Sequence, residues 1–169
     1  YLDDDVVVFA DGGQRRELIR VDGMPMARKG QARHDISNAL GAVALAWSAG
    51  GDLDAICRTL SEFGTRWSDN PGRGQWAQVD GIKLLFDFGH NPDGVSAVLE
   101  MASGLRGPRQ RMSVCLTQAG DRSDADLGAL AEAAARFHPD QVVLRDLPPV
   151  YHRGRSPENL AAIMTRHLV

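Results

Sequence analysis

The sequence IKLLFDFGHNPDG (residues 82–94) joins an apolar strand to the start of a helix, and the predicted fold is built outward from this junction. Pro92 suits the first turn of a helix, where its missing N–H costs nothing. Asp87, His90 and Asn91 lie where the first free N–H groups of that helix point, which suits an anion or a sugar hydroxyl. Asn91 could equally be the helix N-cap and Asp87 a turn residue, so capping and ligand binding both stay open.

Around this junction, strands and helices alternate. Asp80-Gly81 predicts a hairpin between strands at 76–79 and 82–88, because an Asp-Gly pair favours the tight turn. Apolar periodicity predicts helices at 91–103, 127–137 and 157–167 and strands at 112–116 and 141–144. This alternation predicts an α/β fold, a Rossmann-like layered parallel sheet with helices on both faces. Such sheets bind ligands at the carboxyl ends of their strands.

The N-terminal part has a different pattern. A β-branched run at 6–9, a Gly12-Gly13 turn and an alternating segment at 18–21 predict a small strand hairpin. Helical patterns at 34–49 and 53–63, the second with Asp52 as N-cap, predict a helical hairpin. Turn-forming residues without periodicity fill 65–74. We therefore place a domain boundary in this segment, which divides the chain into residues 1–70 and 71–169.

The composition argues against binding to nucleic acid or to a membrane. Nineteen Lys and Arg residues against twenty-two Asp and Glu give a net charge of −3, and neither sign forms a long block. No apolar run has the length of a bilayer span, and no signal-type segment opens the chain. We expect a soluble, cytoplasmic protein. Because the chain begins with Tyr1 rather than methionine, we also expect it to be a piece of a longer protein.

The two cysteines, Cys57 and Cys115, are far apart, in segments that predict a helix and a buried strand. They lack the close spacing of metal ligands or of a redox pair. We expect both to be small core residues, and the sequence predicts no metal site.

Two further groups of charged residues have open interpretations. Asp121 and Arg122 precede a predicted helix, where Ser123 or its neighbour could be the N-cap and the acids could favour the positive helix end. Arg153 and Arg155 lie in a loop, where they could pair with an acidic substrate or form a basic surface cluster.

Several segments resemble the Mur ligase superfamily. DFGHNP (87–92) is similar to the D-Y-A-H-N-P motif that opens the C-terminal domain of Mur ligases, folylpolyglutamate synthases and cyanophycin synthetases. HDISNALGAVALAW (34–47) resembles a helix near the end of the central ATPase domain, where Asp35 replaces the motif's first Asn. The other similar segments are LIRVDGMPM (18–26), PGR (71–73), GDRSDAD (120–126) and HRGR (152–155). The last two resemble cyanophycin synthetases in particular.

The resemblance implies roles for individual residues. Residues 1–70 would end the central ATPase domain, and residues 71–169 would form the C-terminal domain. The residues implied in nucleotide binding are Asn38 (adenine), Asp87 (ribose), His90 (phosphate chain), Arg73 (terminal phosphates) and Asn91. His90 and Arg73 would act in catalysis through their phosphate contacts. The residues implied in substrate binding are Asp121, Arg122, Arg153 and Arg155.

The sequence contains no G-x-x-x-x-G-K-[ST] stretch, which would supply the backbone nest and the lysine for the β- and γ-phosphates. We therefore expect ATP and Mg²⁺ to be bound mainly by an upstream part, and this chain alone to be inactive. In the complete enzyme the resemblance implies that a carboxylate forms an acyl phosphate, which an amino acid's amine opens to an amide. For a cyanophycin-type ligase these would be an aspartate side chain of an Asp-Arg polymer and arginine. The alternatives are another Mur- or folylpolyglutamate-type ligase and a non-catalytic α/β module that binds a ligand or partner; a homo-oligomer is compatible with each.

Overall fold

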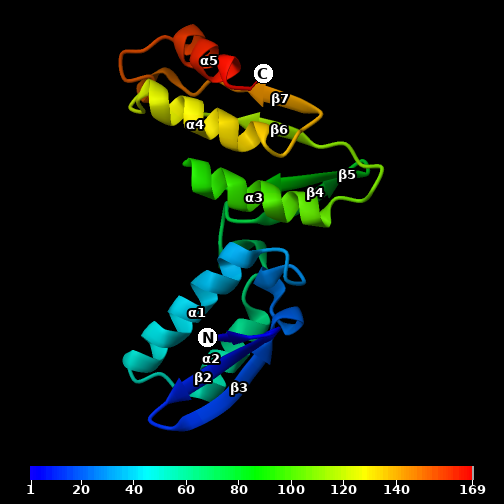
Figure 1. Cartoon of the computed structure of the whole chain (residues 1–169), viewed down its shortest axis with the longest axis vertical. Coiled ribbons are helices and arrows are strands. Elements are labelled where there is room, and N and C mark those ends of the chain that lie inside the picture. The colour runs from blue at the N-terminus through cyan, green and yellow to red at the C-terminus, as the bar shows by residue number, and fades with distance from the viewer. Residues whose placement is uncertain (169) are drawn as a thin grey trace. The chain divides into compact units, whose positions relative to one another are not determined.

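Two separate hydrophobic cores form along the chain. The computed structural model describes residues 1–168, and the chain divides by contacts into the units Tyr1–Asp87 and Phe88–Val169. Each unit is described by itself. The architecture is mixed α/β with several small sheets, which confirms the predicted fold class (Figure 1). Among residues 1–168, no helix is both long enough and apolar enough to cross a membrane.

The first unit combines an antiparallel sheet, two helices and a hairpin. Its strands are β1 (Leu2–Asp3), β2 (Val6–Asp11), β3 (Gln14–Arg20), β4 (Gln75–Val79) and β5 (Ile82–Phe86). Its helices are α1 (Arg33–Ser48) and α2 (Leu53–Glu62), with short 3-10 turns at η1 (Val21–Gly23), η2 (Pro25–Ala27) and η3 (Trp67–Asp69). The predicted strand hairpin and both predicted helices are confirmed. The prediction did not include β1 or the 3-10 turns.

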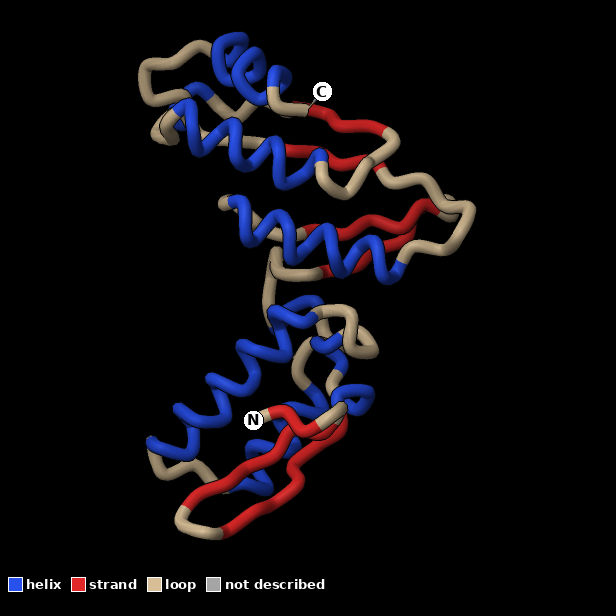
Figure 2. Tube along the Cα trace, in the orientation of Figure 1, coloured by secondary structure: helices blue, strands red, loops and turns tan. Residues whose placement is uncertain are grey.

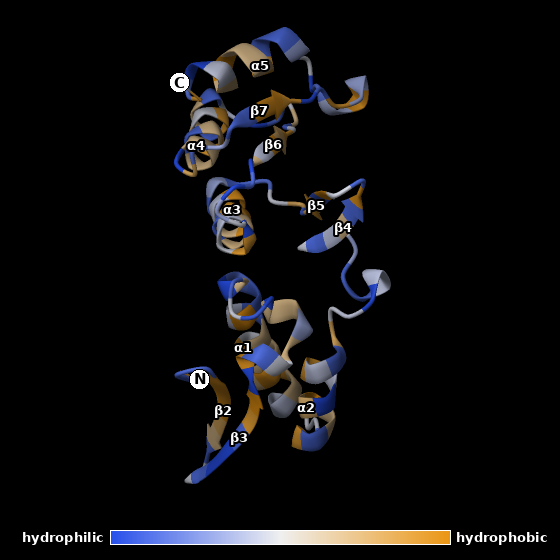
Figure 3. Cartoon of the chain, turned by 90° about the vertical axis from the view of Figure 1, so that its right-hand side faces the viewer, coloured by the Kyte–Doolittle hydropathy of each residue, from blue (hydrophilic) through white to orange (hydrophobic). Residues whose placement is uncertain are grey.

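The core of the first unit lies between the β1–β2–β3 sheet and helices α1 and α2, which lie on one side of it (Figures 1 and 3). The first residues of strand β2 are apolar and mostly buried, while the far end of the β2–β3 hairpin is hydrophilic (Figure 3). Val7, Met24 and Ile36 are among the buried residues of this core. Asp52 caps α2 as predicted, because its carboxylate accepts a 2.8 Å hydrogen bond from the Ala55 N–H.

The hairpin β4–β5 has the turn that its Asp-Gly pair predicts. The strands pair antiparallel, with Val79 opposite Ile82, so that only Asp80 and Gly81 form the turn. Both residues have positive φ, 49° and 80°. A two-residue hairpin turn of this kind requires that conformation at both positions, which Asp and Gly adopt most readily.

The second unit combines a parallel strand pair with three helices (Figure 2). Its elements are α3 (Pro92–Leu105), β6 (Ser113–Leu116), α4 (Asp124–Ala135), β7 (Gln141–Leu144), the 3-10 turn η4 (Pro149–Tyr151) and α5 (Pro157–Arg166). Each helix and each strand was predicted from the sequence. Strands β6 and β7 pair in register from Ser113 opposite Gln141 to Leu116 opposite Leu144.

The helices of the second unit share one core with one face of the strand pair. Val114 and Leu116 of β6 are buried there against Leu127 of α4, which is completely buried. The other face of the strands is open, because Cys115 and Val143 are exposed. The expectation that Cys115 is a core residue was therefore wrong. Side chains alternate between the two faces of a strand, and Cys115 lies on the face opposite the core. Cys57 is half-buried in the first unit.

Removal of a large side chain from this core should destabilise the second unit. We expect Leu127→Ala to lower the free energy of unfolding by about 2–5 kcal/mol, because the cavity adds to the lost burial. Val143→Ala is the control and should change it by less than about 0.5 kcal/mol. Urea unfolding followed by circular dichroism measures both. Equal effects of the two substitutions would show that this core is not the one that holds the unit together.

Candidate functional site

A carboxylate at the end of β5 anchors the loop that carries Arg73. Oδ2 of Asp87 accepts a 2.8 Å hydrogen bond from the Gly74 N–H, and the Gly74 carbonyl accepts a 3.0 Å bond from Nη2 of Arg28. A carboxylate held in this way can accept a hydrogen bond from a ligand hydroxyl without first being ordered.

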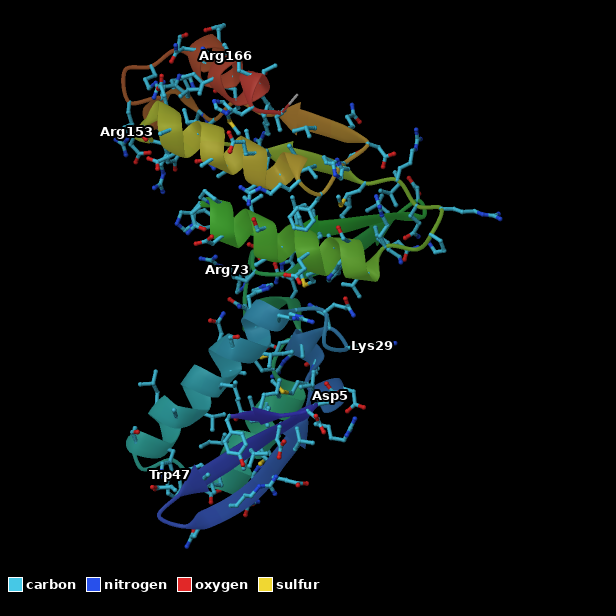
Figure 4. The ribbon with its side chains drawn as sticks, in the orientation of Figure 1. Asp5, Lys29, Trp47, Arg73, Arg153 and Arg166 are labelled. Atoms are coloured by element: carbon cyan, nitrogen blue, oxygen red, sulfur yellow. The ribbon has the colours of Figure 1, made fainter. Side chains whose placement is uncertain are left out.

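The Arg73 loop is also held from within by Gln75, the buried polar side chain of this unit. Its Oε1 accepts a 2.7 Å bond from the Gly72 N–H, and its amide donates to the Trp67 carbonyl. Gly72 and Gly74 have φ of 73° and 55°, so the chain turns at glycines on both sides of Arg73. Arg73 itself is exposed (Figure 4). An exposed guanidinium on a fixed loop suits a phosphate ligand.

Asp35, at the first turn of α1, interacts electrostatically with Asp87 and Arg28. Burial raises the pKa of the Asp35 carboxyl above its ordinary value of 3.8, and the charge of Asp87 raises it further. His34 and Arg28 act on this pKa in the opposite direction, and Nε2 of His34 lies 3.6 Å from Oδ1 of Asp35. Asn38, one turn further along α1, is exposed. The first unit therefore brings together Asp87, the Arg73 loop and the start of α1.

In the second unit, His90 and Asn91 lie at the start of α3. The Asn91 side chain caps the helix, with Oδ1 accepting a 2.7 Å bond from the Gly94 N–H. Nδ1 of the exposed His90 lies 3.2 Å from the Phe88 carbonyl, and the two rings are 5.4 Å apart. The cap occupies the oxygen of Asn91, and the side chains of His90 and Asn91 are both exposed. The capping interpretation of Asn91 is thus observed, and its nucleotide role stays a prediction.

The carboxyl ends of β6 and β7 lie at the same end of the second unit as the start of α3 and α4 (Figure 1). The 117–123 loop after β6 and the 145–156 loop after β7 meet there, where the Gly120 N–H donates a 2.9 Å bond to the Tyr151 carbonyl. Asp121 and Arg122 of the first loop are exposed, as is Arg153 of the second (Figure 4). Parallel pairing therefore gathers three of the four predicted substrate residues at one edge.

The fourth of these residues, Arg155, points into the protein. Its Nη1 donates a 2.9 Å bond to the Arg122 carbonyl, and its Nη2 lies 2.5 Å from Oδ1 of Asp124. Nε and Nη2 also donate to Oδ1 of Asn159 at 3.2 and 2.9 Å. Only 22% of the side chain is exposed. The cap of the adjacent helix α4 is Ser123, which accepts from the Asp126 N–H, as one open interpretation had it.

Residue pattern alone did not single out several residues that hold these groups. The sequence analysis gave no functional role to Arg28, Gln75 or the pair Asp146–His152. Oδ1 of Asp146 lies 2.9 Å from Nε2 of His152, which also contacts the Leu147 carbonyl at 2.7 Å. Arg28 and Gly74 are far apart in the sequence, and a contact between such residues produces no local sequence pattern that would predict it. His152 was within a recognised segment, where its loop position could have suggested a structural role.

The donors present do not form a metal site. Within the described chain, 1–168, no group of three or more His, Cys, Asp or Glu residues could hold a metal ion. A carboxylate such as that of Asp87 and an exposed guanidinium such as that of Arg73 are groups that can bind a sugar hydroxyl and a phosphate, so the nucleotide roles of these residues stay predictions.

Comparisons with known proteins identify the family to which this chain is similar. The family model described as "Mur ligase, glutamate ligase domain" matches residues 72–168. Similar proteins include the cyanophycin synthetases of Crocosphaera subtropica, 33% identical over 123 residues, and of Synechocystis, 31% identical over 146 residues. The UDP-N-acetylmuramate--L-alanine ligase of Hyphomonas neptunium is 29% identical over 141 residues.

These matches cover most of this chain but little of each relative. They cover 73%, 86% and 82% of the chain, respectively, and 14%, 16% and 28% of the three relatives. The family match begins at residue 72, whereas the division by contacts falls after Asp87. The boundary at residues 70 and 71 therefore stays a prediction.

Asp35→Asn should stabilise the first unit at neutral pH. The folded-state pKa of Asp35 lies above the unfolded one, so the charged carboxylate costs stability at neutral pH. This cost fades as the pH falls through the raised pKa toward 3.8, and the advantage of the variant should shrink with it. Urea unfolding followed by tryptophan fluorescence reports on this unit, because all three Trp residues lie in it.

Asp69→Asn is the control with the opposite sign. A hydrogen bond from the Arg66 N–H is the main cause that lowers the pKa of Asp69. The variant should therefore lose stability at neutral pH, and the loss should vanish as the pH falls through the lowered pKa. If Asp35→Asn instead destabilises the unit at neutral pH, the burial cost assigned to Asp35 is refuted.

Proposed function

The chain belongs to the Mur ligase family through its glutamate ligase domain, and from this premise we propose that it works as the carboxyl-terminal part of an ATP-dependent amide ligase. Since the relatives are several times longer than this chain, the proposal includes an upstream ATP-binding part that the chain works with. The observation that carries it is the edge of the second unit, where Asp121, Arg122 and Arg153 gather at the carboxyl ends of parallel strands. Ligands bind to α/β sheets at this position.

Within this proposal, the first unit contributes to the nucleotide. Asp87, fixed by the Gly74 N–H, accepts from ribose hydroxyls, and Arg73 clamps the terminal phosphates. Asn38 contacts the adenine. The role proposed for the second unit is that His90 and Asn91 donate to a phosphate chain from the start of α3. The support for these roles is the exposure of Asn38, Arg73, His90 and Asn91 and the fixed position of the Asp87 carboxylate.

The reaction needs no covalent protein nucleophile. A substrate carboxylate attacks the γ-phosphate, the bond to ADP breaks, and an acyl phosphate forms. The amine of an amino acid then attacks the acyl carbon, phosphate leaves with the bonding electrons, and the amine loses its proton as the amide forms. Catalysis of this type depends on positioning and on charge neutralisation, which exposed arginines and helix N-termini supply.

For the substrate we propose a cyanophycin synthetase-like reaction, in which arginine is added to aspartate side chains of a polymer. The similarity to cyanophycin synthetases supports it, and so does the exposed carboxylate of Asp121 at the substrate edge, since carboxylates pair with a guanidinium. The similarity to the Hyphomonas UDP-N-acetylmuramate--L-alanine ligase favours alanine as a second candidate. The two candidates differ in which amino acid stimulates ADP release.

In the protein that joins this chain to its ATP-binding part, ADP release should depend on arginine rather than on alanine. Asp87→Ala and His90→Ala should each lower this turnover at least about tenfold, because hydrogen bonds to charged groups contribute roughly 1.5–3 kcal/mol. Glu100→Ala is the control, an exposed carboxylate in α3 that should leave turnover unchanged. Wild-type turnover in both Asp87→Ala and His90→Ala would remove their nucleotide roles, and stimulation by alanine alone would favour the second candidate.

The 169-residue chain alone should bind ATP weakly. The phosphate-binding loop is absent from its sequence, so most of the phosphate contacts are missing. Calorimetric titration with ATP should give a Kd above about 1 mM, or no detectable heat. Micromolar affinity would contradict the division of the nucleotide site between this chain and an upstream part.

A further inference from the structure

Two loops at the substrate edge are joined by contacts that the proposed chemistry does not use. The 117–123 loop approaches the 145–156 loop so closely that a Cβ on Gly120 would lie 1.7 Å from the His152 carbonyl oxygen. The Gly120 N–H donates to the Tyr151 carbonyl beside it. No atom other than hydrogen fits between Gly120 and the opposite backbone, so the two loops are in direct backbone contact.

Arg155 provides the second connection between these loops. Its guanidinium bonds to the Arg122 carbonyl, at the end of the first loop, and to Asp124, at the start of α4. The same guanidinium bonds to Asn159 in α5. Because all three of its nitrogen atoms are engaged in the protein and the side chain is mostly buried, little of it is left for a substrate.

The 145–156 loop is also closed on itself. His152 contacts Asp146 and the Leu147 carbonyl through Nε2, and only 16% of its side chain is exposed. Between the fixed residues His152 and Arg155 lies Arg153, which is exposed and forms no hydrogen bond or ion pair with another residue of the described chain, 1–168. Its φ of 52° and that of Gly154, 83°, turn the chain between the two fixed positions.

We propose that Arg155 is a positioning residue, which joins the two loops so that Arg153 faces the substrate together with Asp121 and Arg122. This inference rests on the proposed function, and it assigns different roles to two arginines that are two positions apart. Arg153 contacts the substrate, and Arg155 contacts only the protein. A loop held in the binding conformation before the substrate arrives saves the free energy of ordering it on binding.

The division predicts different results for the two arginines. In the ligase that contains this chain, Arg155→Ala should raise the KM for the amino acid about tenfold, with kcat and the KM for ATP close to wild type. Arg155→Lys should recover part of this loss, because it keeps the positive charge opposite Asp124 but lacks the forked guanidinium that bonds to several partners. Arg153→Ala should also lower the amino-acid-dependent release of ADP. Arg136→Ala, an exposed arginine at the end of α4, is the control for loss of charge and should leave the kinetics unchanged.

Hydrogen exchange of the 169-residue chain separates this proposal from the proposed function. Arg155→Ala should speed exchange of the 145–156 amides and of the Gly120 N–H about tenfold or more, with the α3 amides unchanged, whereas Arg153→Ala should leave exchange at the wild-type rate. Wild-type exchange in Arg155→Ala, or equal acceleration throughout the second unit, would overturn the positioning role. If exchange behaves as expected but the wild-type ligase shows no amino-acid-dependent ADP release, the proposed function fails and the loop connection stands.

Discussion

The parallel pairing of β6 with β7 is the constraint on which the candidate substrate site depends. Parallel strands end at the same edge, so the loops that follow them must meet although 28 residues separate their paired positions Ser113 and Gln141. The buried alternate residues of β6 fix which face of the strand meets the helices. A register change of one residue would therefore bury the wrong side chains and move both loops at once.

In the first unit, the carboxylate of Asp87 has two roles. Asp87 holds the Gly74 backbone by accepting a hydrogen bond from its N–H. Its charge also raises the pKa of the half-buried Asp35, whose own burial is the larger cause. Arg28 opposes this effect while it holds the Gly74 carbonyl from another side. Loop geometry and electrostatics in the first unit are therefore linked through the same few atoms, as is common where ligands bind.

Local patterns predicted the elements well, because they depend on residues that are close in sequence. Asp80-Gly81 sets a turn through its positive φ angles, and Asp52 and Asn91 each set a helix start through a bond to a neighbouring N–H. Contacts over long sequence separations were not predictable in this way. Arg155 was expected at the substrate, yet its partners Arg122 and Asp124 turn it inward. Cys115 was expected in the core, because the pattern of β6 did not show that one face of the strand is open.

The contact at Gly120 also limits how sequences of this fold can diverge. The atom that a side chain there would strike is a main-chain carbonyl oxygen, that of His152. A smaller residue at position 152 would leave that oxygen in place, so no compensating substitution at 152 can make room. Position 120 is thus expected to change only together with an altered length or path of the 145–156 loop, and covariation between the two positions should be absent.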